Sequence, residues 1–328
     1  MDRRAFVIVL AGLFAAVPGG ESTAERGRQP AVIGILSPWL ASESPTAAEA
    51  FRQGLSELGY TARDGVRLDY RSSEGHDDRL LTLAAELVAA KVDILVAATV
   101  PAIRAAQQAT TTIPIVMMWS SDPVRLGLVQ SLSRPGGNTT GMASLLFDLG
   151  AKRVEILKEA IPKLSRLAVL FNPTNPAVRE GANQTAIGAQ KLGVTARLFE
   201  MREPTHIDTT FAAILQERSD GLVVVPDAIM NVHAARIAEL AAKNRIPSMW
   251  GGSGFTDAGG LISYGIDEKQ HVRDVVRCID KVIKGAKPAD LPVEQPTKFW
   301  LVISLKTAKA LGLTIPQSLL QRADQVIE

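Results

Sequence analysis

The stretch DILVAATVPAIRAAQQATTTIPIVMMWSSDPV, residues 93–124, alternates apolar runs with turn signals. Its first apolar run, Ile94 to Ala98, predicts a buried strand. Thr99 and Pro101 predict the N-cap and the first turn of a helix. A second apolar run, Ile115 to Trp119, predicts another buried strand. In a parallel α/β sheet, the turns after both strands fall at the carboxyl ends, where such sheets bind ligands.

The rest of the chain repeats this alternation of strand and helix. Besides the two strands above, strands are predicted at residues 32–36, 66–71, 139–145, 167–171, 194–199, 221–225, 246–250, 260–264 and 298–303. Helices are predicted at residues 46–58, 79–91, 126–132, 151–161, 177–192, 208–217, 232–243, 267–285, 305–311 and 316–323. Most strands are near-continuous apolar runs, which is typical of parallel sheets covered by helices on both faces.

An internal duplication indicates two similar lobes. Three pairs of segments match in order: residues 35–38 with 170–173, 93–96 with 220–223, and 113–114 with 246–247. The spacing also holds, since Pro38 and Pro114 are 76 positions apart (114 − 38) and Pro173 and Pro247 are 74 apart (247 − 173). Two doubly wound lobes that face each other would gather their strand-end turns around one cleft, a preferred site for a small ligand.

The N-terminus predicts an exported protein. Arg3-Arg4, the apolar run from Ala5 to Val17 and the small residues Ser22-Thr23-Ala24 form the three regions of a signal peptide covering residues 1–24. The arginine pair leaves both the general secretory route and the twin-arginine route open. The single cysteine, Cys278, excludes an internal disulfide. These features fit the bacterial periplasm.

Composition excludes several classes of protein. The 328 residues carry a net charge of +2, with 46% hydrophobic and 21% charged residues, which is a globular composition. No basic run indicates nucleic-acid binding. No Gly-x-Ser-x-Gly elbow or P-loop is present, and Gly252-Ser253-Gly254 lacks the rest of a dinucleotide fingerprint. His76-Asp77-Asp78 is interpreted as a solvated turn, so we expect no metal, no cofactor and no catalytic residue.

Several sequence blocks resemble one known family. These blocks are IPIV at 113–116 with DPV at 122–124, RPGGN at 134–138, AGGL at 258–261 with SYG at 263–265, GAKPADLP at 285–292 and KTAKALGL at 306–313. In this order they resemble the periplasmic substrate-binding components of an ABC transporter family that includes tryptophan-binding members. The resemblance covers essentially the whole mature chain.

The resemblance implies the type I periplasmic binding protein fold, with two lobes joined by three crossovers near Met142, Gly265 and Pro296. The first lobe would comprise residues 25–142 and 266–296. The second would comprise residues 143–265 and 297–328, although the placement of the tail is open. Where relatives often carry two acids before a proline, this chain has Ser121-Asp122, so the ligand does not transfer directly from relatives.

Ten residues at the predicted strand ends are candidates for ligand binding: Ser37, Trp39, Thr99, Ser120, Ser121, Asp122, Asn172, Asp227, Trp250 and Tyr264. The hydroxyls and the Asn172 amide could hydrogen-bond a ligand, while Asp122 and Asp227 could accept an ammonium group. Trp39 and Trp250 could stack on a planar ligand, and Tyr264 lies near a predicted hinge. Each has a purely structural alternative, namely a cap, a turn or a core position.

The function expected is capture of a small organic solute and its delivery to an ABC permease in the inner membrane. The family resemblance implies an amino acid as the leading candidate, and Trp39 with Trp250 is compatible with an aromatic one. Closure of the hinge over the ligand would be the mechanism. We expect a monomer. Two alternatives stay open from the sequence: a sensing subunit of the same fold that reports to a membrane receptor, and a periplasmic α/β enzyme.

Overall fold

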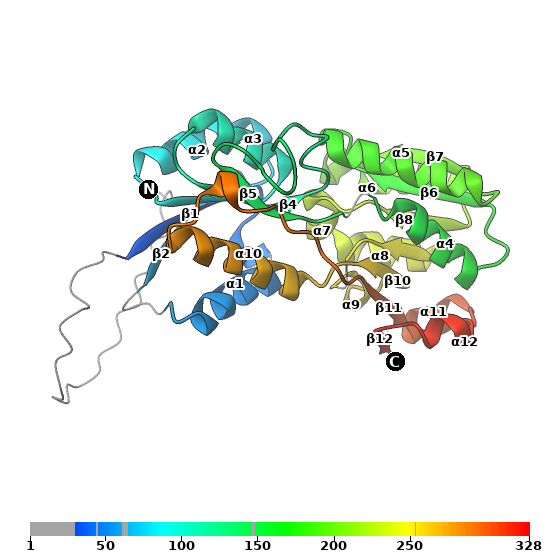
Figure 1. The fold of residues 1–328 in the computed structure, drawn as a ribbon. Helices are drawn as coiled ribbons and strands as arrows, with labels where there is room; N and C mark the ends of the chain where they lie inside the picture. Colours follow the sequence, from blue (N-terminus) through cyan, green and yellow to red (C-terminus); the bar gives the residue numbers. More distant parts are fainter. Residues whose placement is uncertain (1–29, 44, 61–64, 146–147, 253) are drawn as a thin grey trace. The chain divides into compact units, whose positions relative to one another are not determined.

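The computed structural model describes residues 30–328 except 44, 61–64, 146–147 and 253 (Figure 1). Two compact units emerge: unit 1 holds Pro123–Met142, Val272–Glu294 and the chain up to Trp119, and unit 2 holds Ser120–Asp122, Ala143–His271 and Gln295–Glu328. The chain therefore changes unit after Trp119, Asp122, Met142, His271 and Glu294. The crossovers near Met142, Gly265 and Pro296 stay a prediction. The predicted signal peptide lies outside the described residues.

Unit 1 is built on a five-stranded sheet. Its strands are β1 (Ala31–Ser37), β2 (Val66–Ser72), β3 (Ile94–Ala97), β4 (Ile115–Ser120) and β5 (Thr139–Ala143). They lie in the order β2-β1-β3-β4-β5. β1 pairs in parallel with β2 and β3, and β3 pairs in parallel with β4. The central strands are buried on both faces, which explains their apolar sequence.

Four helices cover this sheet: α1 (Pro45–Glu57), α2 (Leu80–Ala89), α3 (Val100–Ala109) and α10 (Glu268–Ile283). α2 and α3 lie on one face, and α1 with α10 on the other, where α10 runs beside α1 despite its distance in sequence (Figure 1). Val272, Val275 and Ile279 of α10 pack on Ile33 and Ile35 of β1 in one buried cluster. Cys278 lies buried in the same helix as a free thiol.

Unit 2 is built on a seven-stranded sheet. Its strands are β6 (Arg166–Phe171), β7 (Thr195–Glu200), β8 (Gly221–Val224), β9 (Ser248–Trp250), β10 (Ile262–Gly265), β11 (Trp300–Ser304) and β12 (Gln325–Ile327). Their order is β12-β11-β10-β9-β8-β6-β7. All the reported pairs are parallel except β10 with β11, which is antiparallel.

Helices cover both faces of the second sheet. They are α4 (Gly150–Ala160), α5 (Pro176–Lys191), α6 (Ile207–Gln216), α7 (Ala228–Val232), α8 (Ala234–Lys243), α9 (Gly254–Asp257), α11 (Leu305–Leu311) and α12 (Gln317–Leu320). Alternate residues of the strands separate the core into two clusters. Leu167 and Val169 pack on the side of α4 and α5, whereas Ala168 and Leu170 pack on the side of α6 and α8.

The predicted duplication is confirmed by the order of the strands. β2-β1-β3-β4-β5 of unit 1 has the same arrangement as β7-β6-β8-β9-β10 of unit 2. The helix that follows the fifth strand belongs to the other unit in both cases: α4 follows β5 and packs in unit 2, and the core of α10 follows β10 and packs in unit 1. The α/β class and the two-lobed type I fold expected from the sequence are therefore correct.

Two local predictions are wrong. Residues 126–132 form successive turns and not a helix, because Gly127 has a left-handed φ of +67° and the amides of Leu128 and Val129 both bond the carbonyl of Pro123. The last segment also holds a strand, β12, that the sequence did not suggest, since its short run of exposed residues lacks an apolar pattern. Within the described part of the chain, no helix has the length and apolarity needed to cross a membrane.

Candidate functional site

The carboxyl end of the unit 1 sheet carries two of the predicted hydroxyls. Ser37 is the last residue of β1, and its Oγ accepts a hydrogen bond from the amide of Trp39 (3.2 Å). Thr99 follows β3, and its Oγ1 accepts from the amide of Ala102 (3.5 Å) as the N-cap of α3. Both capping alternatives are thus confirmed. A hydroxyl that accepts such a bond still has its own proton available for a ligand.

Trp39 lies in the loop directly after β1 and is half-buried. Its main-chain carbonyl accepts a hydrogen bond from the phenol of Tyr70 on β2 (2.7 Å). This bond fixes the loop after β1 to the neighbouring strand. The indole is consequently held at the carboxyl edge of the sheet by the main chain on which it is mounted.

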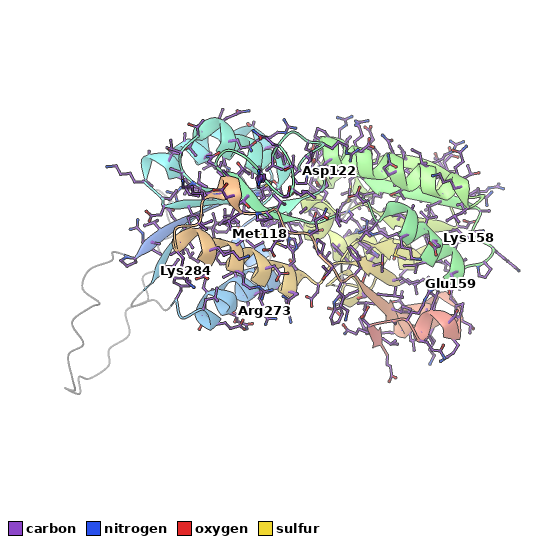
Figure 2. The ribbon with its side chains drawn as sticks, viewed as in Figure 1. Met118, Asp122, Lys158, Glu159, Arg273 and Lys284 are labelled. Atoms are coloured by element: carbon purple, nitrogen blue, oxygen red, sulfur yellow. The ribbon has the colours of Figure 1, made fainter. Side chains whose placement is uncertain are left out.

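The segment Ser120–Asp122 follows the strand predicted as the second of the opening stretch. Ser120 and Ser121 are buried, with 1% and 2% of their surface exposed, whereas Asp122 is partly exposed. The carbonyl of Ser120 accepts a hydrogen bond from the hydroxyl of Ser144 (2.9 Å). Asp122, which lies two residues after the end of β4, is labelled in Figure 2. Of the three side chains, the Asp122 carboxylate is the one that solvent or a ligand can reach.

Two predicted residues of unit 2 contact each other. The Asn172 amide, directly after β6, donates to Oδ1 of Asp227 (2.9 Å), which follows β8. Oδ1 of Asp227 also accepts from the amide of Ile229 (3.2 Å) as the N-cap of α7. The side-chain oxygen of Asn172, Oδ1, accepts hydrogen bonds from both the amide and the hydroxyl of Thr174. The Asp227 carboxylate is therefore oriented by the end of β6 and by the first turn of α7.

The structure places Trp250 in the core, which differs from the predicted ligand-stacking role. The residue is 0% exposed and its ring stacks on Phe255, with centroids 5.0 Å apart. Its indole N–H donates to the hydroxyl of Ser248 (2.8 Å). The physical reason is strand alternation: Ser248 and Trp250 lie within β9 and point to the same face, which α6 and α8 cover.

Tyr264 lies on β10 and is half-buried. Its ring packs at a tilted angle against Phe299, with centroids 6.0 Å apart. Its main-chain carbonyl accepts a hydrogen bond from Nε of Arg153 (2.9 Å). The side chain thus presents an aromatic surface close to the chain crossover that the sequence placed at Gly265.

Arg153 is the residue of this region that the sequence interpretation missed. It lies on α4, is 2% exposed, and its burial lowers the pKa of the guanidinium to about 9. A signal was present, because Arg153 shares the apolar stripe of its helix with Leu157 and Ala160 at i+4 and i+7.

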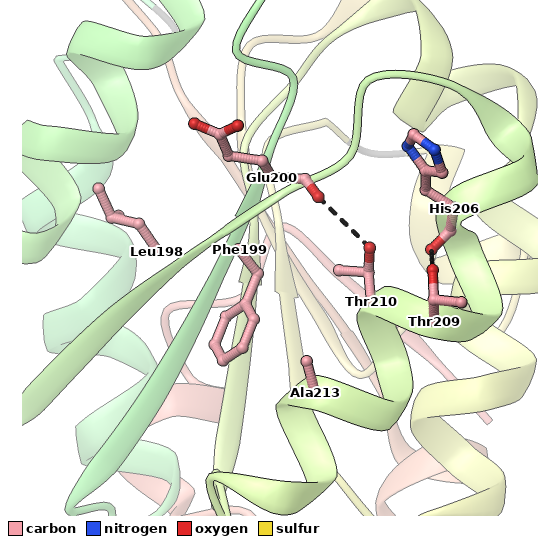
Figure 3. Close-up of a pocket in the computed structure, with 7 residues that line it drawn as sticks. All are labelled: Leu198, Phe199, Glu200, His206, Thr209, Thr210 and Ala213. Atoms are coloured by element: carbon pink, nitrogen blue, oxygen red, sulfur yellow. Dashed lines mark hydrogen bonds between the residues drawn. The ribbon is translucent and has the colours of Figure 1, made fainter.

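A surface pocket of about 370 Å³ lies elsewhere in unit 2, along the edge strand β7 and helix α6 (Figure 3). It is lined by Leu198, Phe199, Glu200, His206, Thr209, Thr210 and Ala213. The hydroxyls of Thr209 and Thr210 donate to main-chain carbonyls, and Glu200 pairs with two arginines. None of the ten predicted residues lines this pocket. Among the residues that the structure describes, no cluster of His, Cys, Asp and Glu could hold a metal ion.

Comparison with known proteins identifies the family. The model of the ABC transporter substrate binding protein family matches residues 42–327, which is most of the chain. The chain belongs to this family. The substrate-binding protein is 26% identical over 268 residues to the tyrosine-binding protein of Clostridioides difficile (strain R20291), covering 81% of this chain and 76% of the relative.

Solved structures of relatives share the fold of this substrate-binding protein. The ABC domain from Streptococcus pneumonia, solved in complex with L-Trp, is 28% identical and superposes with a TM-score of 0.83, covering 91% of this chain and 100% of that one. A conserved domain protein from Vibrio cholerae superposes with a TM-score of 0.84 at 24% identity, with the same coverage. The family resemblance and the solute-binding role expected from the sequence are therefore confirmed.

Proposed function

We propose that this substrate-binding protein captures an amino acid with an aromatic side chain outside the cytoplasm and delivers it to an ABC permease. The observation that carries the proposal is the matched pair of sheets, each with oriented polar side chains at the carboxyl ends of its parallel strands. Relatives that bind tyrosine or were solved with L-Trp support the choice of ligand class.

An amino acid presents three chemical features, and the predicted residues offer a partner for each. The ammonium group fits the partly exposed carboxylates of Asp122 and Asp227. The carboxylate fits the partly exposed Thr99 hydroxyl and the N-terminus of α3, whereas Ser37 is 1% exposed and shapes the loop after β1. The aromatic side chain fits the half-buried rings of Trp39 and Tyr264. Asn172 orients Asp227 and acts through it.

The buried side chains have a different part in the proposal. Ser120 and Ser121 shape the main chain that carries Asp122, and the core ring of Trp250 supports the end of β9. Residues 1–24 act as a cleavable signal, so the exported protein begins at Glu25. The mature protein is a monomer that needs neither metal nor cofactor and performs no catalysis.

Thermal stabilisation by free amino acids tests the ligand class. Ligand that binds only the folded state raises its stability by about 2.7 kcal/mol at one hundred times the dissociation constant. We expect L-tryptophan, L-tyrosine or L-phenylalanine to raise the melting temperature in a saturable way, with L-alanine as the control without an aromatic ring. Stabilisation by L-alanine alone would contradict the aromatic preference, and no response to any amino acid would contradict the proposal.

A further inference from the structure

Arg153 is a charged side chain in a place where charge is costly. It ranks with Trp250 among the largest fully buried side chains of the described chain, with 2% of its surface exposed. Arginine is seldom buried to this extent, because removing its charge from water costs several kcal/mol unless hydrogen bonds replace the lost hydration. Its guanidinium has a pKa of about 9, so it stays charged at neutral pH. A buried cation of this kind calls for a specific explanation.

Two hydrogen bonds of Arg153 go to the ends of neighbouring strands. Nε donates to the carbonyl of Tyr264 on β10 (2.9 Å), and Nη2 donates to the carbonyl of Gly251 directly after β9 (3.4 Å). β9 and β10 pair in parallel, so both carbonyls lie at the same edge of the sheet. A planar guanidinium can hold two acceptors at a fixed separation, which the single ammonium of lysine cannot do in the same way.

The main chain around the guanidinium is packed without space for extra atoms. A Cβ on Gly251 would overlap the ring of Pro226 and lie 3.2 Å from Nη2 of Arg153. A Cβ on Gly265 would overlap the carbonyl of Gly251. The ends of β9 and β10 therefore lie against the Arg153 side chain, and Pro226, which follows β8, packs against Gly251 at the end of β9.

These strand ends carry residues assigned to ligand binding. Asp227 follows Pro226, and Tyr264 is itself one of the acceptors. We propose that Arg153 is a positioning residue of the ligand site, whose guanidinium fixes the main chain beneath Asp227 and Tyr264. This inference rests on the proposed function, because it gives Arg153 its effect on affinity through those two residues.

The internal duplication gives independent support. Arg153 is the fourth residue of α4, the helix that follows the fifth strand of the first repeat. The fourth residue of α10, which follows the fifth strand of the second repeat, is His271. His271 is also 2% exposed. Both helices thus bury a basic side chain at the point where the chain enters them.

The test compares Arg153→Met and Arg153→Lys with the control Lys152→Met in the mature protein. Lys152 is the neighbour on the same helix, with a side chain 41% exposed and paired with Glu155. Arg153→Met keeps the length of the side chain but removes its buried charge and its hydrogen bonds to two carbonyls, so the thermal unfolding of every variant is measured first to establish that it folds. Two further measurements are made: amide hydrogen exchange without ligand, and calorimetric titration with L-tryptophan and L-tyrosine.

We expect Arg153→Met to speed exchange in peptides covering residues 249–252 and 262–266 and to weaken binding by about tenfold or more, the scale of supporting contacts around a site. Arg153→Lys should restore part of both, and Lys152→Met should change neither. Unchanged exchange in Arg153→Met would overturn the inference, as would faster exchange with undiminished affinity. Should the unmodified protein bind neither amino acid, the ligand class is wrong, and the exchange measurement still decides whether Arg153 holds the strand ends.

Discussion

The two sheets share an arrangement of strands, yet their carboxyl ends differ while their amino ends agree. At the amino ends, Asp93 accepts a hydrogen bond from the amide of Val32 (2.7 Å) and so joins the start of β3 to β1. Asp220 accepts one from the amide of Arg166 (2.8 Å) and joins the start of β8 to β6 in the same way. At the carboxyl ends, unit 1 offers the hydroxyls of Ser37 and Thr99. Unit 2 offers instead the linked amide and carboxylate of Asn172 and Asp227.

The amino ends of the strands are therefore alike in the two sheets, and the carboxyl ends are not. At both amino edges a carboxylate accepts hydrogen bonds from strand amides and so satisfies main-chain donors of the fold. If the proposed function holds, the Thr99 hydroxyl would bind the carboxylate of the amino acid, and Asp122 and Asp227 would bind its ammonium group. The repeat therefore keeps the arrangement of the strands, while the polar side chains at the carboxyl ends differ between its halves.

The largest expected effect concerns two glycines, one in β5 and one in β10, where the main chain of a neighbouring segment approaches closely. Gly141 lies in the fifth strand of unit 1, with φ +129°, and a Cβ there would overlap the main chain of Met117 on the fourth strand. Gly265 stands in the fifth strand of unit 2 against Gly251, so the close approach recurs. We expect Gly141→Ala and Gly265→Ala each to lower the free energy of unfolding by about 3 kcal/mol, measured in urea.

The control for this pair is Gly285→Ala. Gly285 also has a positive φ, of +97°, but nothing lies within 4 Å of the Cβ that alanine would add. Its cost should be near 1 kcal/mol, that of the backbone conformation alone. If both fifth-strand variants cost no more than this control, the strands of the repeat do not depend on the close approach.

The second prediction separates the two amino-edge aspartates. Asp220 accepts bonds from the amides of Ser165 and Arg166 and from the Ser165 hydroxyl, whereas Asp93 accepts from Val32. Asp220→Ala should therefore cost about 2 kcal/mol in the free energy of unfolding and Asp93→Ala about 1 kcal/mol. As a reference, Asp208→Ala removes an ion pair with Arg236 from a side chain that is 72% exposed, and should cost about 0.5 kcal/mol. If all three substitutions lower the free energy of unfolding equally, the hydrogen bonds of Asp93 and Asp220 stabilise the fold no more than an exposed ion pair does.

The third prediction concerns the carboxyl edges. A double-mutant cycle of Asn172→Ala and Asp227→Ala should give a coupling of about 1 kcal/mol, because the two side chains share a hydrogen bond. The same cycle on Ser37→Ala and Thr99→Ala should give a coupling near zero, since each hydroxyl bonds a main-chain amide. The cycles are measured by chemical denaturation. Coupling of the same size in both units would contradict the difference drawn here.

The smallest expected effect is a pH dependence of the free energy of unfolding at α10, the helix that follows β10 in the chain and packs in unit 1. The phenol of Tyr60 donates to Asp280 of α10 (2.7 Å). Burial, together with this carboxylate, raises the pKa of Tyr60 from 10.0 to about 12. The folded state thus holds the proton more tightly than the unfolded state. This contribution to stability is fully present below about pH 10 and is lost as the pH rises through about 12.

Denaturation of the wild-type protein and the Tyr60→Phe variant between pH 9 and pH 12 measures this effect. The difference in unfolding free energy between them should change with pH above about 10, with the wild type losing more stability. Cys278, whose pKa burial raises to about 11, is present in both proteins and cancels in the difference. A difference independent of pH would show that Tyr60 does not report the docking of α10.

Much of the fold followed from the sequence because strands buried on both faces leave long apolar runs. The matched segments at Asp93 and Asp220 led to the correct equivalence of the third strands, β3 and β8. What failed was local. Residues 126–132 have helical spacing, yet Gly127 and the bonds to Pro123 turn the chain back on itself. β12 is exposed and short, so no apolar pattern announces it.

The candidate site followed less completely. Position after a strand identified Asn172 and Asp227, which the structure brings into contact. Position after a strand did not predict that the Trp250 side chain packs in the core. That outcome depends on where β9 ends and on which face of the sheet its last residue lies. Arg153 was missed since burial of a charge depends on acceptors from distant strands, which a local pattern does not contain.

The most direct test of the central claim is calorimetric titration of the mature protein with L-tryptophan and L-tyrosine, repeated for Asp122→Asn, Asp227→Asn and Thr99→Val. The account predicts saturable binding of one amino acid per chain, weakened by a substitution at the carboxyl edge of either sheet. Absence of binding to both amino acids, or binding that only the substitutions at one sheet affect, would contradict it.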